Sequence, residues 1–253
     1  MRRHPVAALA CGFALLAGCA VSGAAVPAQW NGGAERVVLV HGLWRSSRAM
    51  KPLEGPLLAA GYGVCGIDYP STDETPERLV ELIDRALRET CGWSGGRLNF
   101  VTHSLGGVVV RAYLSAHPLA DVGRVVMLAP PNRGSELVDA LGASWLIRAA
   151  IGPTAVALGT SPESLPNRLG PPEFELGVIA GTRGESWLAN LLAGENDGLV
   201  SVESTKLVGM RDFVTVPETH ISIRRSPEVA EQVVRFLKTG SFEHAVADAR
   251  SGY

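Results

Sequence analysis

Short apolar segments with the character of buried strands alternate along this chain with longer segments of helical character. The strand-like segments occupy residues 36–40, 61–67, 97–101, 123–129, 174–180 and 212–216. Helical patterns fill residues 53–60, 76–90, 104–117 and 227–238. Parallel strands need connections of this length, and the connecting helices then cover both faces of the sheet. The sequence therefore predicts a three-layer α/β domain with a mostly parallel sheet of about six strands.

Composition and charge agree with one globular domain. The chain has 253 residues, of which 46% are hydrophobic and 19% are charged, enough for a sizeable core. The net charge is −2 and the 23 basic residues are scattered, so nucleic acid is excluded as a partner. Neither a cluster with metal-ligand spacing nor a glycine-rich phosphate loop is apparent, so we expect no cofactor and no metal.

Two regions depart from the alternation of strands and helices. Residues 131–172 carry no strand signal but hold two apolar helical stretches, 136–151 and 154–158, which predicts a small helical cap inserted over the site. The apolar residues of this cap would line the approach to the site, or else pack in the core: Leu137, Leu141, Trp145, Leu146 and Ile147. Residues 241–253 are polar and small, which predicts a loose C-terminal tail.

The N-terminus has the pattern of an export signal. Arg2 and Arg3 precede an apolar stretch, 6–17, that is too short to cross a bilayer and ends in small residues. The segment Leu16-Ala17-Gly18-Cys19 resembles the lipobox of bacterial lipoproteins. This resemblance implies removal of residues 1–18, lipidation of Cys19 and a tether over residues 19–35. The alternative is an ordinary signal peptide that is cleaved near residues 24–27.

Export has consequences for charge, location and the cysteines. Removal of residues 1–18 leaves 21 basic residues against 25 acidic ones, so the mature domain is mildly acidic. Ala20 after the cysteine resembles lipoproteins sorted to the outer membrane, which places the chain in the bacterial cell envelope, facing the periplasm. Cys65 lies in a predicted strand and Cys91 just past a predicted helix. If that helix packs antiparallel on the strand, the two cysteines can form a disulfide; otherwise they are buried thiols.

Residues 99–107 combine a strand, a tight turn and the start of a helix around one serine. The apolar run to His103 is followed by Ser104, Leu105, Gly106 and Gly107, and then by further helical residues. A serine on such a turn stands clear of the sheet within reach of a base, and the next amide can point at an oxyanion. Ser104 is therefore a candidate nucleophile; a serine helix cap followed by glycines is the alternative.

The segment Thr102-His103-Ser104-Leu105-Gly106 resembles the Gly-x-Ser-x-Gly turn of α/β-hydrolases of the bacterial lipase and esterase type, with Thr102 in place of the first glycine. A second similarity is the apolar strand that runs into His41-Gly42-Leu43. In that family the amides after His-Gly and after the nucleophile form the oxyanion hole, which implies Leu43 and Leu105 here. The resemblance implies an α/β-hydrolase fold for residues 36–240, with His41 and His103 as packing residues.

The same family places its catalytic triad in the order serine, acid, histidine. The histidines after Ser104 are His117, His220 and His244. His117 ends the helix that the serine begins, about 20 Å away at 1.5 Å per residue, and His244 lies in the tail. His220, which precedes the last helix, is therefore the expected base.

For the acid we expect Asp197, since residues 194–201 resemble the Asn-Asp-Gly-x-Val segment of bacterial lipases. Glu195 is the competitor, and an Asx turn with Gly198 is the alternative role for Asp197. Other acidic residues are less well placed, in the cap region or at the end of an earlier strand: Asp139, Glu163, Glu173 and Asp68.

These features predict a serine hydrolase that cleaves carboxylic esters, with small-molecule or lipid esters as substrates. Ser104 would attack, His220 would move the proton, and Asp197 would orient His220. The same triad could serve a thioesterase, an amidase or an acyltransferase, and the fold could also belong to an inactive anchored binding protein.

Overall fold

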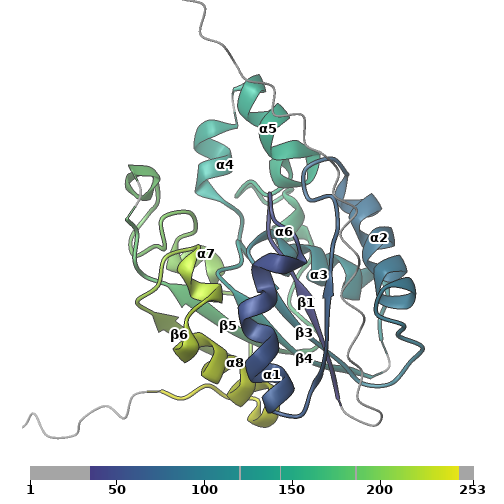
Figure 1. The fold of residues 1–253 in the computed structure, drawn as a ribbon. Coiled ribbons are helices and arrows are strands. Elements are labelled where there is room, and N and C mark those ends of the chain that lie inside the picture. Colours follow the sequence, from purple (N-terminus) through teal and green to yellow (C-terminus); the bar gives the residue numbers. More distant parts are fainter. Residues whose placement is uncertain (1–34, 120, 143, 186, 245–253) are drawn as a thin grey trace, which may run out of the picture.

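The computed structural model describes residues 35–244 except 120, 143 and 186, and these form an α/β domain around one six-stranded sheet (Figure 1). All neighbouring strands are parallel, in the order β2-β1-β3-β4-β5-β6. The strands are β1 (Arg36–Val40), β2 (Gly63–Ile67), β3 (Leu98–His103), β4 (Val122–Leu128), β5 (Glu175–Gly181) and β6 (Asp212–Val216). The predicted fold class is confirmed.

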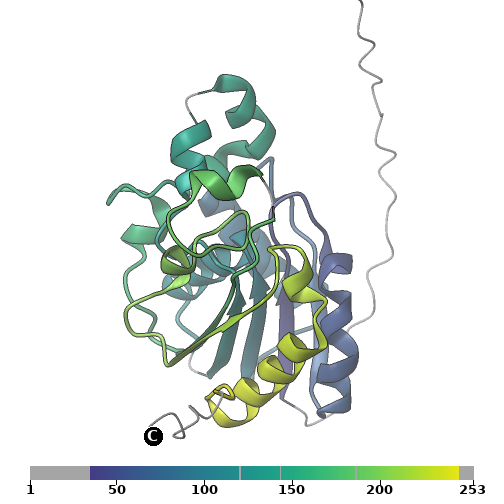
Figure 2. The ribbon, with the colours of Figure 1, turned by 90° about the vertical axis from the view of Figure 1, so that its left-hand side faces the viewer.

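Four helices cover the two faces of the sheet, as predicted. The helices are α1 (Glu54–Ala59), α2 (Pro76–Glu89), α3 (Leu105–Ala116) and α8 (Pro227–Thr239). Alternate residues of β1 point to opposite faces. Val38 and Val40 pack with residues of α2 and α3, whereas Val37 and Leu39 pack with residues of α1 and α8. Each face of the sheet therefore forms a hydrophobic core with the helices that cover it. Figure 2 shows α1 and α8 together on one side of the sheet.

The strand order fixes the place of the site. From β1 the chain crosses to β2 on one side, and β3 then lies on the other side of β1. At such a reversal of strand order, the loops after the carboxyl ends of the two central strands diverge and leave room for a ligand. The loop after β1 contains Gly42 and the turn after β3 contains Ser104, so both predicted parts of the site meet at this point.

Residues 131–172 form three short helices beyond the end of the sheet (Figure 2). They are α4 (Glu136–Leu141), α5 (Trp145–Val156) and α6 (Leu165–Arg168). The expectation of one helical stretch over residues 136–151 is wrong, because α4 ends at Leu141 and α5 begins at Trp145. The second break is at Gly152, where φ is 80° and a Cβ would lie 1.8 Å from the carbonyl oxygen of Thr72. A close contact with a distant loop therefore decides where the helix bends.

Arg111 on α3 ties α6 to the body of the domain. Its buried guanidinium donates to the carbonyl oxygens of Asn132 (3.0 Å), Pro166 (3.0 Å) and Gly170 (2.9 Å). Burial lowers the pKa of Arg111 to about 10. The arginine is thus a structural residue that uses carbonyl acceptors to hold the inserted segment.

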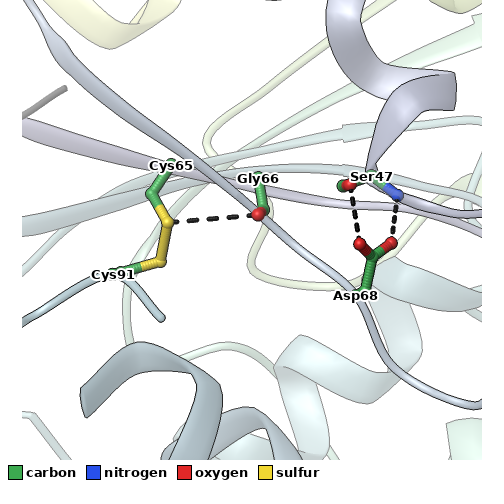
Figure 3. Close-up of a disulfide and its surroundings, with 5 residues drawn as sticks. All are labelled: Ser47, Cys65, Gly66, Asp68 and Cys91. Atoms are coloured by element: carbon green, nitrogen blue, oxygen red, sulfur yellow. Dashed lines mark hydrogen bonds between the residues drawn. A yellow bond between two sulfur atoms is a disulfide. The ribbon is translucent and has the colours of Figure 1, made fainter. Parts of the chain in front are cut away.

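Cys65 in β2 and Cys91 just after α2 form a disulfide, with 1.98 Å between the sulfurs and 5.8 Å between the Cα atoms (Figure 3). The chain returns along α2 against the sheet, so its end comes back beside β2. This is the arrangement on which the sequence-based expectation of a disulfide depends.

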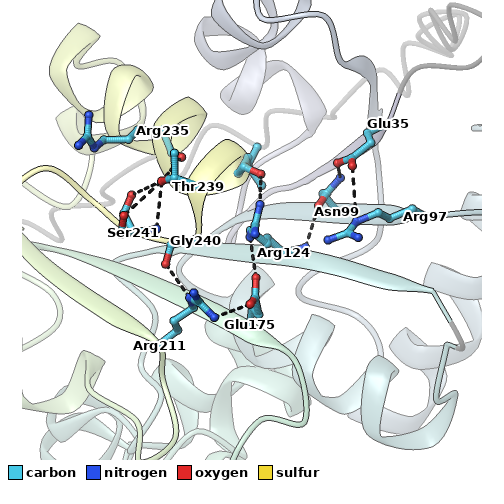
Figure 4. Close-up of polar contacts among 11 residues, drawn as sticks. Glu35, Arg97, Asn99, Arg124, Glu175, Arg211, Arg235, Thr239, Gly240 and Ser241 are labelled. Atoms are coloured by element: carbon cyan, nitrogen blue, oxygen red, sulfur yellow. Dashed lines mark hydrogen bonds and ion pairs between the residues drawn. The ribbon is translucent and has the colours of Figure 1, made fainter.

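The amino-terminal edge of the sheet is held by a polar network (Figure 4). Arg124 on β4 binds Glu175 on β5 at 2.6 Å and the carbonyl oxygen of Leu237 on α8 at 2.8 Å. Arg211 also pairs with Glu175 and donates to the carbonyl oxygen of Gly240 at 2.9 Å. The end of α8 is therefore fastened to the sheet.

The expectation of a loose tail from residue 241 is wrong for residues 241–244. Phe242 is buried, with its ring 4.8 Å from that of Phe236 on α8, and His244 lies 2.9 Å from a carboxylate oxygen of Asp212. The Phe242 ring and the contact of His244 with Asp212 therefore hold this polar segment against the core. Residues 245–253, the expected signal peptide, most of the tether and Cys19 lie outside the described residues.

Four further short elements complete the described chain: η1 (Ser47–Leu53), η2 (Trp187–Leu191), α7 (Val202–Thr205) and η3 (Ser222–Arg224). Within the ranges that the structure describes, no helix has both the length and the apolar character needed to cross a bilayer.

Candidate active site

Ser104 occupies a strained turn between β3 and α3. Its φ of 55° and ψ of −127° are unfavourable for a residue with a Cβ, at a cost of about 1–3 kcal/mol. The turn is tight because the helix begins directly at Leu105. At Gly106 a Cβ would lie 2.5 Å from the carbonyl oxygen of His41, and at Gly107 it would lie 3.0 Å from Pro130. Glycine is therefore required for α3 to approach the neighbouring loops this closely.

Ser104, His220 and Asp197 are brought together from three separate loops. Oγ of Ser104 lies 3.0 Å from Nε2 of His220, and Nδ1 of the same ring lies 2.7 Å from Oδ2 of Asp197. Asp197 and His220 are buried, whereas Ser104 is partly exposed. The three side chains that the family resemblance implies as a triad thus form a continuous hydrogen-bonded chain that ends at an accessible hydroxyl.

Asp197 has both roles that the sequence leaves open. Its Oδ1 accepts from the backbone N–H groups of Leu199 (2.9 Å) and Val200 (2.8 Å), which is the Asx-type turn, while Oδ2 faces His220. The backbone N–H of His220 also donates to the carbonyl oxygen of Asp197 at 3.0 Å. The turn therefore orients the carboxylate rather than competing with the contact to histidine.

Gly181 at the end of β5 lets the acid and histidine loops approach each other. A Cβ at this position would lie 2.4 Å from the carbonyl oxygen of Glu218 and 2.8 Å from Cβ of Asp197. The sequence does not single out Gly181, because the two loops that it contacts are distant from it along the chain.

The competing acids lie elsewhere. Glu195 is exposed, as are Glu163 and Glu173 in the inserted segment. Asp139 accepts from the backbone N–H of Thr160 at 3.2 Å. Asp68 accepts from the backbone N–H and the hydroxyl of Ser47, at 2.6 and 2.9 Å (Figure 3).

His41 and His103 are both buried beside the site. The His41 ring stacks on Tyr69 with 4.2 Å between centroids, and burial lowers its pKa. Nε2 of His103 donates to the carbonyl oxygen of His220 at 2.8 Å. Burial, and then the charge that His220 can carry, hold the pKa of His103 well below its usual range. The neutral ring with its proton on Nε2 therefore supports the backbone of the catalytic histidine candidate, a specific contact that the sequence does not reveal.

The other two histidines are remote from the triad. His117 follows α3 and stacks on Tyr113 at 5.1 Å, while His244 pairs with Asp212 at the first residue of β6. Both positions agree with their exclusion as the base.

Leu43 and Leu105 lie on the two loops that flank Ser104. Leu105 is the first residue of α3, so its N–H belongs to the helix N-terminus, where amides lack intrahelical acceptors. A Cβ at Gly42 would lie 2.9 Å from Cβ of Ser104, so the backbone that leads into Leu43 passes directly beside the serine. The two residues expected to form the oxyanion hole therefore lie on backbone segments that adjoin Ser104.

Trp44 secures the loop after β1. It has a φ of 55°, its backbone N–H donates to Oγ of Ser71 at 3.1 Å, and its indole N–H donates to the carbonyl oxygen of Ala150 at 3.0 Å. The loop that carries Leu43 is therefore joined directly to α5. Among the described residues, no group of three or more histidine, cysteine or acidic side chains is arranged to hold a metal ion.

The chain belongs to the alpha/beta hydrolase family, because the model of that family matches residues 37–248. Several solved structures share the fold. The mature lipase BlEst2 of Bacillus licheniformis has a TM-score of 0.63 and 22% identity, over 83% of this chain and 94% of its own. Phospholipase PlaB of Legionella pneumophila has a TM-score of 0.64 and 19% identity, over 83% of this chain and 60% of its own.

A monoacylglycerol lipase of Paleococcus ferrophilus is also similar, with a TM-score of 0.52 and 20% identity over 81% of this chain and 95% of its own. At these sequence identities the similarity shows a shared fold and does not by itself define the activity. No match was found among the curated proteins.

Proposed function

We propose that this protein is an exported serine hydrolase that cleaves carboxylic esters through an acyl-enzyme. The observation that carries the proposal is the chain of contacts from Ser104 Oγ to His220 Nε2 (3.0 Å), and from His220 Nδ1 to Asp197 Oδ2 (2.7 Å). A serine hydroxyl becomes a useful nucleophile only when a base removes its proton, and the base needs a carboxylate to fix its tautomer.

The reaction would proceed in two halves. Oγ of Ser104 attacks the ester carbonyl while His220 accepts the hydroxyl proton, and the amides of Leu43 and Leu105 stabilise the oxyanion. The ester C–O bond then breaks, and His220 passes its proton to the departing alcohol. In the second half water attacks the acyl-enzyme, His220 accepts a proton from the water and returns it to Oγ, and the carboxylic acid leaves. Each amide donor of the oxyanion hole would contribute about 3 kcal/mol to the lowering of the barrier.

Two observations support the proposed substrate class: the residues near the site and the descriptions of proteins with similar folds. Similar folds include a protein described as a lipase, one described as a phospholipase and one described as a monoacylglycerol lipase. Apolar residues at this edge of the sheet, such as Leu43 on the loop after β1 and Leu146 on α5, would favour apolar acyl chains.

The test is covalent labelling by a fluorophosphonate probe, together with hydrolysis of short and medium acyl esters. We expect the wild-type chain to be labelled and active, and Ser104→Ala to be folded, unlabelled and inactive. Ester hydrolysis that survives Ser104→Ala would overturn the proposal.

We also propose that Cys19 is lipidated and anchors the domain in the bacterial cell envelope, at the outer membrane facing the periplasm. The support is the sequence Leu16-Ala17-Gly18-Cys19 followed by Ala20. Cys19→Ala should leave no lipid on the N-terminal peptide and should lower the share of the protein in the membrane fraction. Mass spectrometry that finds an unmodified N-terminus after Cys19 in the wild-type protein would contradict lipidation.

A further inference from the structure

Six large apolar side chains are exposed on the loops and helices that follow the carboxyl ends of the strands, at the same edge of the sheet as Ser104. We call them the apolar rim: Trp44, Trp145, Leu146, Trp187, Leu191 and Ile221. The three tryptophans are 59%, 74% and 72% exposed in chain order. A soluble domain rarely presents several exposed tryptophans around one site without using them for binding.

The rim residues lie on segments that adjoin the candidate site or one another. Ile221 directly follows His220, and Trp44 directly follows Leu43. The indole of Trp44 donates to the carbonyl oxygen of Ala150, so it lies against α5, which carries Trp145 and Leu146. The segment η2, which carries Trp187 and Leu191, packs beside α4. A surface that covered this rim would therefore also cover the approach to Ser104.

Basic side chains accompany the rim. Arg45 follows Trp44, Arg148 lies one helical turn after Trp145, and Arg225 lies four residues after Ile221. All three are exposed, and across the described residues no carboxylate lies within 4.0 Å of their guanidinium groups.

Arg224 adds a buried positive charge to the same place. It donates to the carbonyl oxygen of Ile221 at 2.6 Å, and its Nε has no hydrogen-bond partner in the part of the chain that the structure describes. Burial lowers the pKa of Arg224, and the charges of Arg225 and Arg45 lower it further, so the three guanidinium groups are close enough to repel one another.

Acidic residues also lie on the loops at this edge, but among the described residues none forms an ion pair with Arg45, Arg148 or Arg225. Glu185 pairs with Arg183 at 2.8 Å, Asp68 accepts from Ser47, and Glu195 is exposed on the acid loop. Arg45, Arg224 and Arg225 thus form a local cluster of guanidinium groups beside the exposed side chains of Trp44 and Ile221.

We propose that the apolar rim, with Arg45, Arg148 and Arg225, docks the domain on the surface of an anionic phospholipid bilayer. Tryptophan is the side chain that favours the boundary between headgroups and acyl chains, and arginines beside it attract anionic headgroups. A second copy of this chain is the less suitable partner, because a two-fold contact through this face would bring the arginine clusters against each other. Delivery of an ester from the bilayer to Ser104 rests on the proposed function, whereas docking itself does not.

The proposed anchor is compatible with this orientation. Glu35 begins the described chain near the opposite edge of the sheet, and 15 residues lie between it and Cys19. A chain of that length can span up to about 50 Å, well beyond the roughly 17 Å of a five-residue strand. The tether is therefore long enough for the rim to meet the membrane in which Cys19 would be anchored.

The test is vesicle co-sedimentation of the mature chain, residues 19–253, carrying Cys19→Ser, so that neither the apolar signal segment nor a lipid anchor contributes. The vesicles consist of phosphatidylcholine alone or of phosphatidylcholine with phosphatidylglycerol. Trp145→Ser combined with Trp187→Ser should weaken binding to both by tenfold or more, since both indoles are exposed and their loss leaves the core intact. Arg45→Gln combined with Arg225→Gln should remove the preference for anionic vesicles, at about fivefold per arginine.

Matched controls lie elsewhere on the surface. Val208 is 86% exposed and precedes β6 at the opposite edge of the sheet, and Arg85 is exposed on α2. Val208→Ser and Arg85→Gln should bind vesicles as the parent chain does.

Three outcomes would overturn the proposal: no vesicle binding by the unlipidated parent, unchanged binding by the tryptophan variant, or a dimer that the tryptophan variant abolishes. Hydrolysis of a water-soluble short ester, measured on the same variants, tests the proposed function separately. Ser104→Ala should bind vesicles normally, so a failure of catalysis and a failure of docking are distinguishable.

Discussion

His103 and His220 are 117 residues apart in the chain, yet Nε2 of His103 donates to the carbonyl oxygen of His220 at 2.8 Å. The rings lie 4.8 Å apart, and both are buried. This contact joins the last residue of β3 to the loop after β6. It places the nucleophile turn and the histidine loop in one unit, because His103 is the immediate neighbour of Ser104.

The buried histidines predict how stability depends on pH. The pKa values of His41 and His103 are lowered in the folded state, chiefly by burial. The unfolded chain takes up protons near pH 6.5 whereas these folded histidines do not. The free energy of unfolding should therefore be constant above that pH and fall below it, by up to about 1.4 kcal/mol per pH unit for each histidine.

Urea unfolding of the wild-type chain and of His103→Asn over a range of pH measures this effect. The variant should be less stable at neutral pH but should lose less stability on acidification. His117→Gln, at an exposed position, is the control and should follow the wild-type curve. Equal slopes for His103→Asn and wild type would contradict the assignment of a neutral buried ring.

Asp197→Asn should remove the contribution of the carboxylate to catalysis without disturbing the fold of its loop. The amide oxygen can still accept from the N–H groups of Leu199 and Val200, so the turn persists. The neutral NH2 group that replaces Oδ2 cannot stabilise the imidazolium of His220. We expect kcat on a soluble ester to fall about 1000- to 10 000-fold at neutral pH. The control Glu195→Gln, at an exposed position two residues away, should keep kcat within about twofold of the wild-type value. A larger loss of kcat in Glu195→Gln than in Asp197→Asn would identify Glu195 as the catalytic acid.

Gly42→Ala should impair catalysis more than stability. The new Cβ would lie 2.9 Å from Cβ of Ser104 and 3.1 Å from Nδ1 of His103, which forces the loop that carries the Leu43 amide away from the serine. We expect kcat to fall by about 100-fold or more, because the oxyanion donor is displaced. Gly55→Ala is the matched control, since a Cβ there meets nothing within 4 Å, and it should retain full activity and stability.

Removal of the Cys65–Cys91 disulfide should lower stability without abolishing activity. The bond closes a segment with a sequence separation of 26, so its loss frees the unfolded chain and should cost about 3 kcal/mol. The double variant Cys65→Ser/Cys91→Ser should show a lower Tm that a reducing agent does not change, whereas the wild-type Tm should fall in reducing agent. Two free thiols in the denatured, unreduced wild-type protein would show that the bond does not form in solution.

The local elements of this fold follow from the sequence. Each strand is a short apolar run and each covering helix is amphipathic, and these periodicities depend on neighbours along the chain. Ser104 is also visible locally, because a strand, a serine, two glycines and a helix define its turn. Asp197 and His220 carry no such local mark, and only the similarity to a family with a fixed order of triad residues singles them out.

The tertiary structure decided what depends on contacts between distant segments. Gly152 bends α5 because it meets the backbone of Thr72, Gly181 lets two loops approach each other, and Phe242 packs on Phe236 although its surroundings in sequence are polar. It also decided that Trp145 faces solvent at the edge of the sheet that carries Ser104. Local propensity determines which segments become strands and helices, but the free energy of close packing between segments determines which side chains meet, and that information is spread over the whole chain.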